Sequence, residues 1–178
     1  MDRFQMATLA QWAGGKGIQG RKRLQKVVYF LQAAGCPLSA DFSLHLYGPY
    51  SSEVAKVCDE MVSTTLLKEH KEPNAAGMQY RYVLPKDTER LLRKSEGKNP
   101  QRANELATFK TFGLELLDED LKTLELGSTI HYFYAQTKDW SVAEQEACTF
   151  KRISVDSELT RKALRLARRA YEFRLQSE

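Results

Sequence analysis

The chain has 178 residues, of which 42% are hydrophobic and 28% are charged, and its formal net charge is +4. This length suits one domain or a domain with an appendage, and it is enough to bury a hydrophobic core. No stretch approaches the roughly 18 apolar residues of a membrane span, and the polar start of the chain is unlike a secretory signal. We therefore expect a cytoplasmic protein that does not bind membranes.

The cysteine and histidine positions argue against several kinds of site. Cys36, Cys58 and Cys148 are far apart and form no C-x-x-C pair, which disfavours both a disulfide framework and a zinc site. The three histidines are scattered without metal-ligand spacing, and neither a glycine-rich phosphate loop nor a nucleophile motif is present. We expect no catalytic residue, no metal and no cofactor, and hence a protein that is not an enzyme.

The first part of the chain predicts two helices. A short helix is predicted over Phe4–Ala13. A second helix is predicted over Arg21–Ala34, because four apolar residues have helical spacing there: Leu24, Val27, Val28 and Leu31. Four basic residues occupy the first turns of the second helix: Arg21, Lys22, Arg23 and Lys26. Positive charge there opposes the helix dipole. It indicates either an acidic partner or a solvated cluster that the fold tolerates.

A short strand and a third helix follow. Apolar and polar residues alternate over Phe42–Tyr47, which predicts a half-buried strand, and Gly48-Pro49 predicts a turn that ends it. Ser51 or Ser52 is then a suitable N-cap for a third helix with a buried stripe from Val54 to Val62. The exposed face of this helix carries Glu53, Lys56, Asp59 and Glu60.

A hairpin and a fourth helix complete the first half. The strands are expected at Leu66–Glu72 and Gln79–Leu84, joined by the turn formers Pro73–Gly77, and the helix at Thr88–Lys94. Helices followed by a hairpin match the winged-helix plan. The predicted fold is therefore mainly α with a small β-hairpin: a winged helix-turn-helix domain over residues 1–95 and a helical C-terminal domain over residues 96–178.

The second half begins with a polar segment, Ser95–Pro100, that reads as a linker. Helices are then expected at Arg102–Phe112, Asp118–Gln136, Ser141–Phe150 and from Asp156 or Ser157 to Leu175. The third of these opens with a capping-box pattern, Ser141 followed by Glu144. Charge is uneven along the chain: residues 98–150 carry 5 Lys/Arg against 9 Asp/Glu, while residues 151–178 carry 8 against 4.

The last predicted helix is basic on one side. Its apolar seam is Leu164, Ala167, Tyr171 and Leu175, and its other side carries Arg161, Arg165, Arg168 and Arg169. Such a side is either a solvated face of a packed helix or a surface for nucleic acid. The Tyr47–Tyr50 turn is likewise open to two interpretations, as a device of the fold or as a partner-binding surface, since tyrosines are effective anchors at interfaces.

Two segments resemble a known family. The basic run Gly20–Lys26 with Tyr29 and the later Tyr47–Ser51 are similar to the YwgA-type proteins of bacteria and archaea, and the similarity continues more weakly into Leu124–Ile130 and Glu144–Ile153. This resemblance implies a winged-helix regulator that binds DNA, and it brings no catalytic residues. The tyrosine-glycine-proline segment also resembles, more loosely, the SocA-like (Panacea) antitoxin-associated domain.

Two hypotheses of function follow. The first is a winged-helix DNA-binding transcriptional regulator, expected to be a homodimer, that contacts mainly phosphates. Its candidate contacts are Arg21, Lys22, Arg23, Lys26, Lys68, Lys71, Arg81, Arg161, Arg165, Arg168 and Arg169. The alternative is a non-enzymatic protein-interaction module, antitoxin-like or defence-associated, that meets a basic protein partner. Its candidate contacts are Tyr47, Tyr50, Glu53 and Lys56. The acidic third helix favours the alternative, because carboxylates repel phosphates.

Overall fold

The computed structural model describes residues 1–74 and 77–177. The first half contains α1 (Arg3–Ala13), the 3-10 turn η1 (Gly14–Lys16), β1 (Ile18–Gln19), α2 (Arg21–Ala33), β2 (Ser43–His45), β3 (Gly48–Tyr50), α3 (Ser52–Ser63), β4 (Lys68–Asn74) and β5 (Gly77–Val83). The second half contains α4 (Lys86–Lys98), α5 (Pro100–Ala107), α6 (Lys110–Asp118), α7 (Leu121–Thr137), α8 (Trp140–Lys151) and α9 (Glu158–Ser177). A mainly helical chain with a small antiparallel sheet is thus confirmed.

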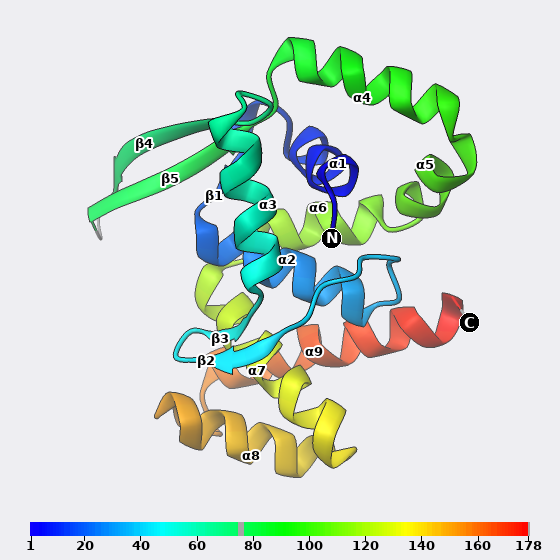
Figure 1. Ribbon diagram of the computed structural model, residues 1–178. Coiled ribbons are helices and arrows are strands. Elements are labelled where there is room, and N and C mark those ends of the chain that lie inside the picture. Colours follow the sequence, from blue (N-terminus) through cyan, green and yellow to red (C-terminus); the bar gives the residue numbers. More distant parts are fainter. Residues whose placement is uncertain (75–76, 178) are drawn as a thin grey trace.

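The β4–β5 hairpin extends away from the helices (Figure 1). It belongs to a three-stranded sheet with the order β1–β5–β4. The strand β1 pairs antiparallel with β5 only at the base of the hairpin, where Ile18 lies opposite Tyr82 and Gln19 opposite Arg81. Both Ile18 and Tyr82 are fully buried. The hairpin is therefore anchored at its base, and its outer part is exposed.

Helix α2 runs through the middle of the molecule (Figure 1) and contacts α6, α7 and α9 as well as α3. Its apolar face, with Phe30 and Leu31 fully buried, joins one hydrophobic cluster that also contains Leu9 of α1, Leu116 of α6 and Leu124 of α7. Burial of this apolar surface is the main force that holds the two halves of the chain together. The predicted boundary between residues 95 and 96 falls inside α4.

A second, smaller cluster joins α7, α8 and α9. Its alanines (Ala143, Ala147, Ala163 and Ala167) are fully buried. Small side chains allow the helices to approach closely. A Cβ added at Gly127 of α7 would lie 2.9 Å from the carbonyl oxygen of Ala163 in α9, so only glycine fits at this crossing.

The predicted turn at Gly48-Pro49 is wrong. These two residues form β3, which pairs with β2 so that Leu44 lies opposite Pro49, and the turn consists of Leu46 and Tyr47. Gly48 has φ +92°, and a Cβ there would lie 2.7 Å from Oγ1 of Thr129 in α7. The glycine is required by its dihedral angle and by this close approach, and it does not mark the turn.

The predicted linker is also wrong. Helix α4 continues through Ser95 to Lys98, and the side chain of Asn99 accepts a hydrogen bond from the Arg102 amide at the start of α5. Pro100 occupies the first turn of α5, where its missing N–H costs nothing. The single helix predicted over Arg102–Phe112 is split, because α5 ends at Ala107 and α6 begins at Lys110.

The other predicted ends agree more closely. Ser51 caps α3 and accepts a hydrogen bond from the Val54 amide, and Ser157 accepts one from the Thr160 amide at the start of α9. Helix α8 is capped by Asp139 and not by the predicted Ser141. The loop expected at Pro73–Gly77 is shorter than predicted, since β4 reaches Asn74 and β5 starts at Gly77. Ala75 and Ala76 of that loop lie outside the described residues.

Candidate functional site

The basic start of α2 has its acidic partners inside the same chain. The guanidinium of Arg21 lies 3.0 Å from the Asp59 carboxylate of α3 and 3.3 Å from that of Glu69 in β4. Its Nε donates to the Tyr82 hydroxyl at 2.9 Å. Arg21 therefore ties α2 to α3 and to the sheet. The unfavourable position of its charge at a helix N-terminus is offset by two carboxylates.

Arg23 is placed differently from the sequence-based expectation. Its side chain is half-buried, and Nη1 donates to the carbonyl oxygen of Leu117 at 3.0 Å and also to those of Leu116 and Glu119. These are carbonyls at the C-terminal end of α6, which have no partner within the helix. Arg23 is thus a cap for α6, and its guanidinium is engaged by carbonyl groups of its own chain.

Lys26 is also removed from the predicted phosphate surface. Its side chain is only 2% exposed, and Nζ donates to the Pro49 carbonyl at 2.6 Å. Burial lowers the pKa of Lys26 to about 7; the Glu125 carboxylate opposes this, and the neighbouring Lys151 and Lys22 reinforce it. An ammonium that remains buried with a carbonyl and no directly paired carboxylate is costly.

Three lysines hold the β2–β3 hairpin, and we call them the lysine clip: Lys22, Lys26 and Lys151. Lys22 Nζ lies 3.3 Å from the centroid of the Tyr47 ring, and Lys151 Nζ donates to the Leu46 carbonyl at 2.7 Å. Glu125 of α7 lies 3.4 Å from Lys22. Lys151 and Glu125 are not among the predicted site residues, because nothing in the local sequence pattern relates them to a turn so far away in the chain.

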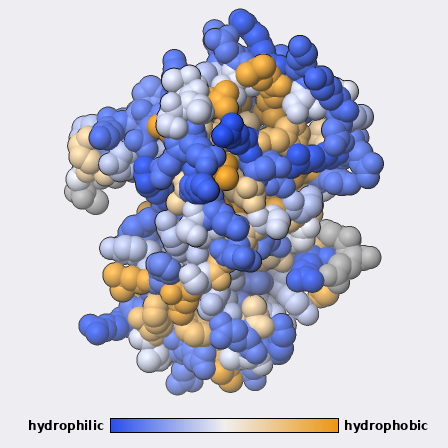
Figure 2. All heavy atoms as spheres, viewed as in Figure 1, coloured by the Kyte–Doolittle hydropathy of each residue, from blue (hydrophilic) through white to orange (hydrophobic). Residues whose placement is uncertain are grey.

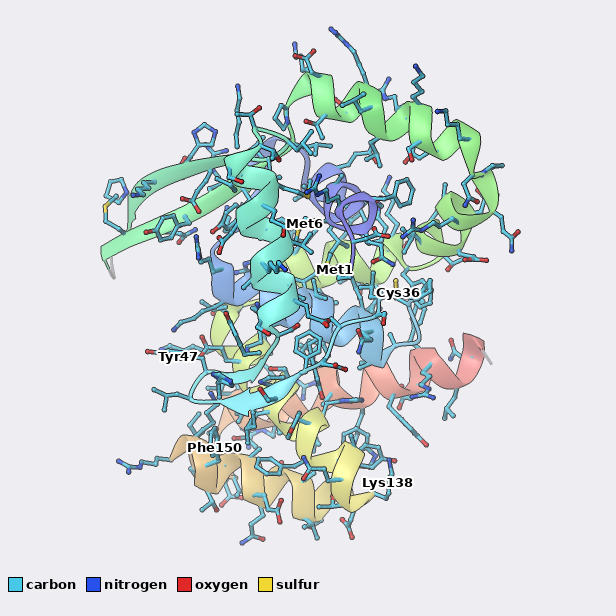
Figure 3. The ribbon with its side chains drawn as sticks, viewed as in Figure 1. Met1, Met6, Cys36, Tyr47, Lys138 and Phe150 are labelled. Atoms are coloured by element: carbon cyan, nitrogen blue, oxygen red, sulfur yellow. The ribbon has the colours of Figure 1, made fainter. Side chains whose placement is uncertain are left out.

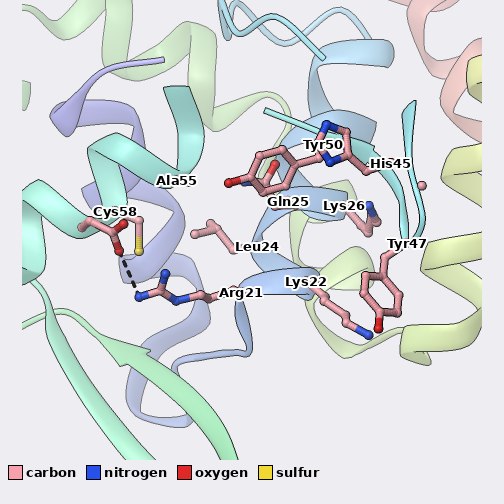
Figure 4. Close-up of a pocket in the computed structure, with 12 residues that line it drawn as sticks. Arg21, Lys22, Leu24, Gln25, Lys26, His45, Tyr47, Tyr50, Ala55 and Cys58 are labelled. Atoms are coloured by element: carbon pink, nitrogen blue, oxygen red, sulfur yellow. Dashed lines mark ion pairs between the residues drawn. The ribbon is translucent and has the colours of Figure 1, made fainter. Parts of the chain in front are cut away.

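A cavity of about 270 Å³ lies between α2, α3 and the β2–β3 hairpin (Figure 4). Its lining residues are Arg21, Lys22, Leu24, Gln25, Lys26, His45, Tyr47, Gly48, Tyr50, Ala55, Cys58 and Asp59. The rings of His45 and Tyr50 lie with their centroids 4.9 Å apart. The cavity thus brings together residues predicted for two different roles: basic residues of α2 and the tyrosines of the predicted partner surface.

Of the exposed face of α3, Asp59 lines this cavity, whereas Glu53, Lys56 and Glu60 lie outside it. Glu53 and Lys56, which were predicted to bind a partner, are both exposed there. The carboxylates of this face have partners: Glu53 accepts a hydrogen bond from the Asp41 amide at 3.2 Å, Asp59 pairs with Arg21, and Glu60 lies 3.4 Å from Arg3. Much of the negative charge of α3 is therefore balanced locally.

The β4–β5 hairpin presents lysines to solvent. Lys68 and Lys71 are exposed, and neither takes part in an ion pair within the described ranges 1–74 and 77–177. Arg81 instead pairs with Glu72 on the facing strand, at 2.6 Å. Of the three predicted hairpin contacts, the two lysines keep an available charge.

The arginines of α9 form a separate basic surface. All four predicted residues are exposed, and Arg169 pairs with Glu115 of α6 at 2.7 Å, whereas Arg168 lies 5.7 Å from the centroid of the Trp140 ring. Helix α9 crosses the lower half of the molecule, and the β4–β5 hairpin extends from the upper half (Figure 1). The candidate basic residues therefore do not form one continuous patch.

Neither a metal-binding cluster nor a membrane-spanning helix is found in the part of the chain that the structure describes. No group of three or more His, Cys, Asp or Glu side chains there could hold a metal ion. Within the same residues, no helix has both the length and the apolar character needed to cross a membrane.

Comparison with known proteins gives one informative relative. No protein-family model matches the chain. A curated protein of Bacillus subtilis (strain 168), described as "Uncharacterized protein YwgA", is 31% identical over 116 residues, which cover 65% of this chain. The match spans 66% of that relative, just under two thirds of its length. This level of identity agrees with the resemblance found in the basic run and the tyrosine-glycine-proline segment. The chain is thus similar to a YwgA protein, as the resemblance of these segments implied.

Proposed function

We propose that this protein is a winged-helix DNA-binding regulator, with α3 as its recognition helix and the β4–β5 hairpin as its wing. The observation that carries this proposal is the topology. The element order α1, β1, α2, α3, β4, β5, with the β2–β3 hairpin inserted between α2 and α3, is combined with the sheet order β1–β5–β4. In such a domain the wing lies beside the recognition helix, and both reach the same duplex.

The charges of α3 are compatible with this role. A helix with three bare carboxylates would be repelled by phosphates, but Asp59 and Glu60 are paired with arginines and Glu53 accepts a backbone N–H. Lys56 remains exposed on the same helix. The repulsion expected from the sequence alone is therefore reduced by partners that come from α1, α2 and the segment before β2.

The wing supplies the main phosphate contacts in this proposal. Lys68 and Lys71 are exposed and lie on a hairpin that extends beyond the body of the molecule. Lysines that contact phosphates release counterions, so affinity depends steeply on salt and only weakly on base sequence. In this proposal α9 and its arginines form a second, separate surface, and Arg23 and Lys26 are structural.

The test is binding to a fluorescent random-sequence duplex across a salt series. We expect the wild-type protein to bind at low salt and to lose affinity linearly in log[salt]. The variant Lys68→Ala/Lys71→Ala should bind more weakly and with a shallower salt slope. The control, Arg165→Ala/Arg168→Ala, removes the same charge from α9 and should bind like the wild type. No binding at low salt, or equal losses in both variants, would contradict the proposal.

A second candidate function rests on the surface at the tip of the β2–β3 hairpin. Leu46 is 73% exposed there, and Phe150 at the end of α8 is 40% exposed. Figure 2 shows hydrophobic residues gathered over this part of the molecule, and Figure 3 labels Tyr47 and Phe150 there. Apolar residues that gather on a surface are typical of protein-binding sites. They favour the protein-interaction module over a purely DNA-binding role.

A photo-crosslinking amino acid at position 46 tests this second candidate in cells. One defined partner should be captured at position 46. The same crosslinker at position 91, where Leu91 is 57% exposed on α4, is the matched control and should capture none. Capture of the same proteins from both positions would argue against a specific site on the hairpin.

A further inference from the structure

The cavity between α2, α3 and the β2–β3 hairpin has the composition of a small-molecule site. Its volume of about 270 Å³ lies just below the roughly 300–1,000 Å³ typical of ligand pockets. Leu24, Ala55 and Cys58 give it an apolar side, and the side chains of Tyr47, Tyr50 and His45 give it aromatic walls (Figure 4). A flat ring fits such surroundings, because ring faces and edges pack well against one another.

The charged groups of the cavity differ in how well they are balanced. Arg21 is fully engaged by Asp59, Glu69 and Tyr82, and its pair with Asp59 lies at one side of the cavity (Figure 4). The lysine clip, by contrast, gathers three ammonium groups around one carboxylate. Only Lys22 pairs directly with Glu125, at 3.4 Å.

Lys26 is the charged group of the cavity that a bound anion would stabilise. It is 2% exposed, it lines the cavity, and the hydrogen bond to Pro49 engages one of its three N–H donors. A buried ammonium is stable when a carboxylate faces it. A bound anion at the lysine side of the cavity would supply that carboxylate, and the aromatic walls would hold the apolar body attached to it.

We propose that this cavity binds a small aromatic carboxylate, with its ring between the tyrosine walls and its acid group at Lys26 and Lys22. A carboxylate suits the site better than a phosphate, since a dianion would demand more donors than this largely apolar cavity provides. The proposal does not rest on the proposed DNA binding, because the ligand would meet Ala55 and Cys58 of α3, whereas Lys56 and the wing lysines do not line the cavity.

Titration calorimetry with 2-naphthoate tests the proposal, and 2-naphthamide serves as the neutral compound of the same shape. We expect the acid to bind at least tenfold more tightly than the amide. Inorganic phosphate should bind more weakly than the acid. Equal affinity for acid and amide, phosphate binding as tight as that of the acid, or no binding of the acid by the folded protein would overturn the proposal.

Two variants locate the site. Lys26→Met removes the buried ammonium and should reduce affinity for the acid to the level of the amide, whereas Lys94→Met on the exposed side of α4 should change nothing. Ala55→Leu fills the cavity from α3 and should abolish binding of both compounds, which keeps the test valid if Lys26→Met disturbs the hairpin. Circular dichroism verifies that each variant is folded. Retained selectivity in Lys26→Met, or unchanged binding in Ala55→Leu, would place the ligand elsewhere.

Proton uptake provides an independent readout. The charged groups facing Lys26 are Glu125 from α7, Lys22 from α2 and Lys151 from α8, and with the cavity empty Lys26 is partly deprotonated at neutral pH. A bound anion favours the charged form of the lysine. Binding of 2-naphthoate at pH 7 should therefore take up a fraction of a proton, measured as a dependence of the binding enthalpy on the buffer. Lys26→Met should show none. Uptake that persists in this variant would contradict the assigned contact.

Discussion

The β2–β3 hairpin and the β4–β5 hairpin differ in what holds them in place. The first has strands of three residues each and is fixed from outside, by the lysine clip and by the contact of Gly48 with Thr129 of α7. The second has strands of seven residues each and is fixed by its own ladder and by β1 at its base. The comparison indicates that a short hairpin depends on side chains from distant elements, whereas a long one depends on its own backbone.

Replacing the glycine of each hairpin should separate these two kinds of support, with the largest effect at Gly48. Gly48→Ala places a Cβ 2.7 Å from Thr129 Oγ1 at a residue with φ +92°. We expect a loss of about 2–4 kcal/mol in the free energy of unfolding. Gly77→Ala is the matched control: φ is +123°, but the space around it is open. It should cost only about 1–2 kcal/mol, measured by urea denaturation. Equal losses would show that dihedral strain alone accounts for both.

The lysine clip predicts that the free energy of unfolding depends on pH above pH 7. Burial lowers the pKa of Lys26 from 10.5 to about 7. Between these values the unfolded chain binds more protons than the folded one, so stability rises with pH over that range. From pH 7 to pH 8.5 the gain should be on the order of 1–2 kcal/mol. Lys26→Met should abolish this rise, and Lys71→Met should keep it. A rise of equal size in Lys26→Met would assign it to another group.

The smallest effect on stability is expected in the wing. Lys68→Ala/Lys71→Ala removes two exposed charges that form no ion pair within residues 1–74 and 77–177, although Lys71 Nζ lies 5.7 Å from the centroid of the Tyr80 ring. Surface changes of this kind stay within about 0.5 kcal/mol per site. The same variant is the one expected to lose affinity for DNA, so its unfolding curve is the control for the binding experiment. A loss of several kcal/mol would mean that these lysines support the hairpin, and the comparison between the two hairpins would then fail.

The same contrast explains which parts of the fold the sequence predicts. The long hairpin shows turn formers between alternating strands, and α2 and α3 show apolar residues at helical spacing, so local pattern was sufficient for them. The turn of the β2–β3 hairpin was misplaced because glycine is needed at position 48 for a different reason. The backbone there passes too close to Thr129 to leave room for a Cβ, and Thr129 lies in a helix far along the chain. The pattern of neighbouring residues in the sequence does not reveal such a long-range contact.

The candidate site shows the same limit. The sequence identified Tyr47 and Tyr50 and the basic start of α2, and the structure brings them to one cavity. The sequence did not reveal that Arg23 caps α6 or that Lys26 is buried, because each fact depends on carbonyl groups of another element. Charge on a helix predicts a binding surface only when no other part of the chain uses that charge.

The crossing of α7 and α9 at Gly127 has a consequence for how this protein is synthesised. The space that a Cβ at Gly127 would fill is bounded by Phe30 of α2 and by the Ala163 backbone. A ribosome that adds about 5–20 residues per second needs on the order of ten seconds to extend the chain from Phe30 to Ala163. During that interval α2 can contact α3, α6 and α7 as they emerge, but its contacts with α9 cannot form. The close crossing of α7 and α9 beside α2 is therefore among the last contacts of the fold that the growing chain can complete.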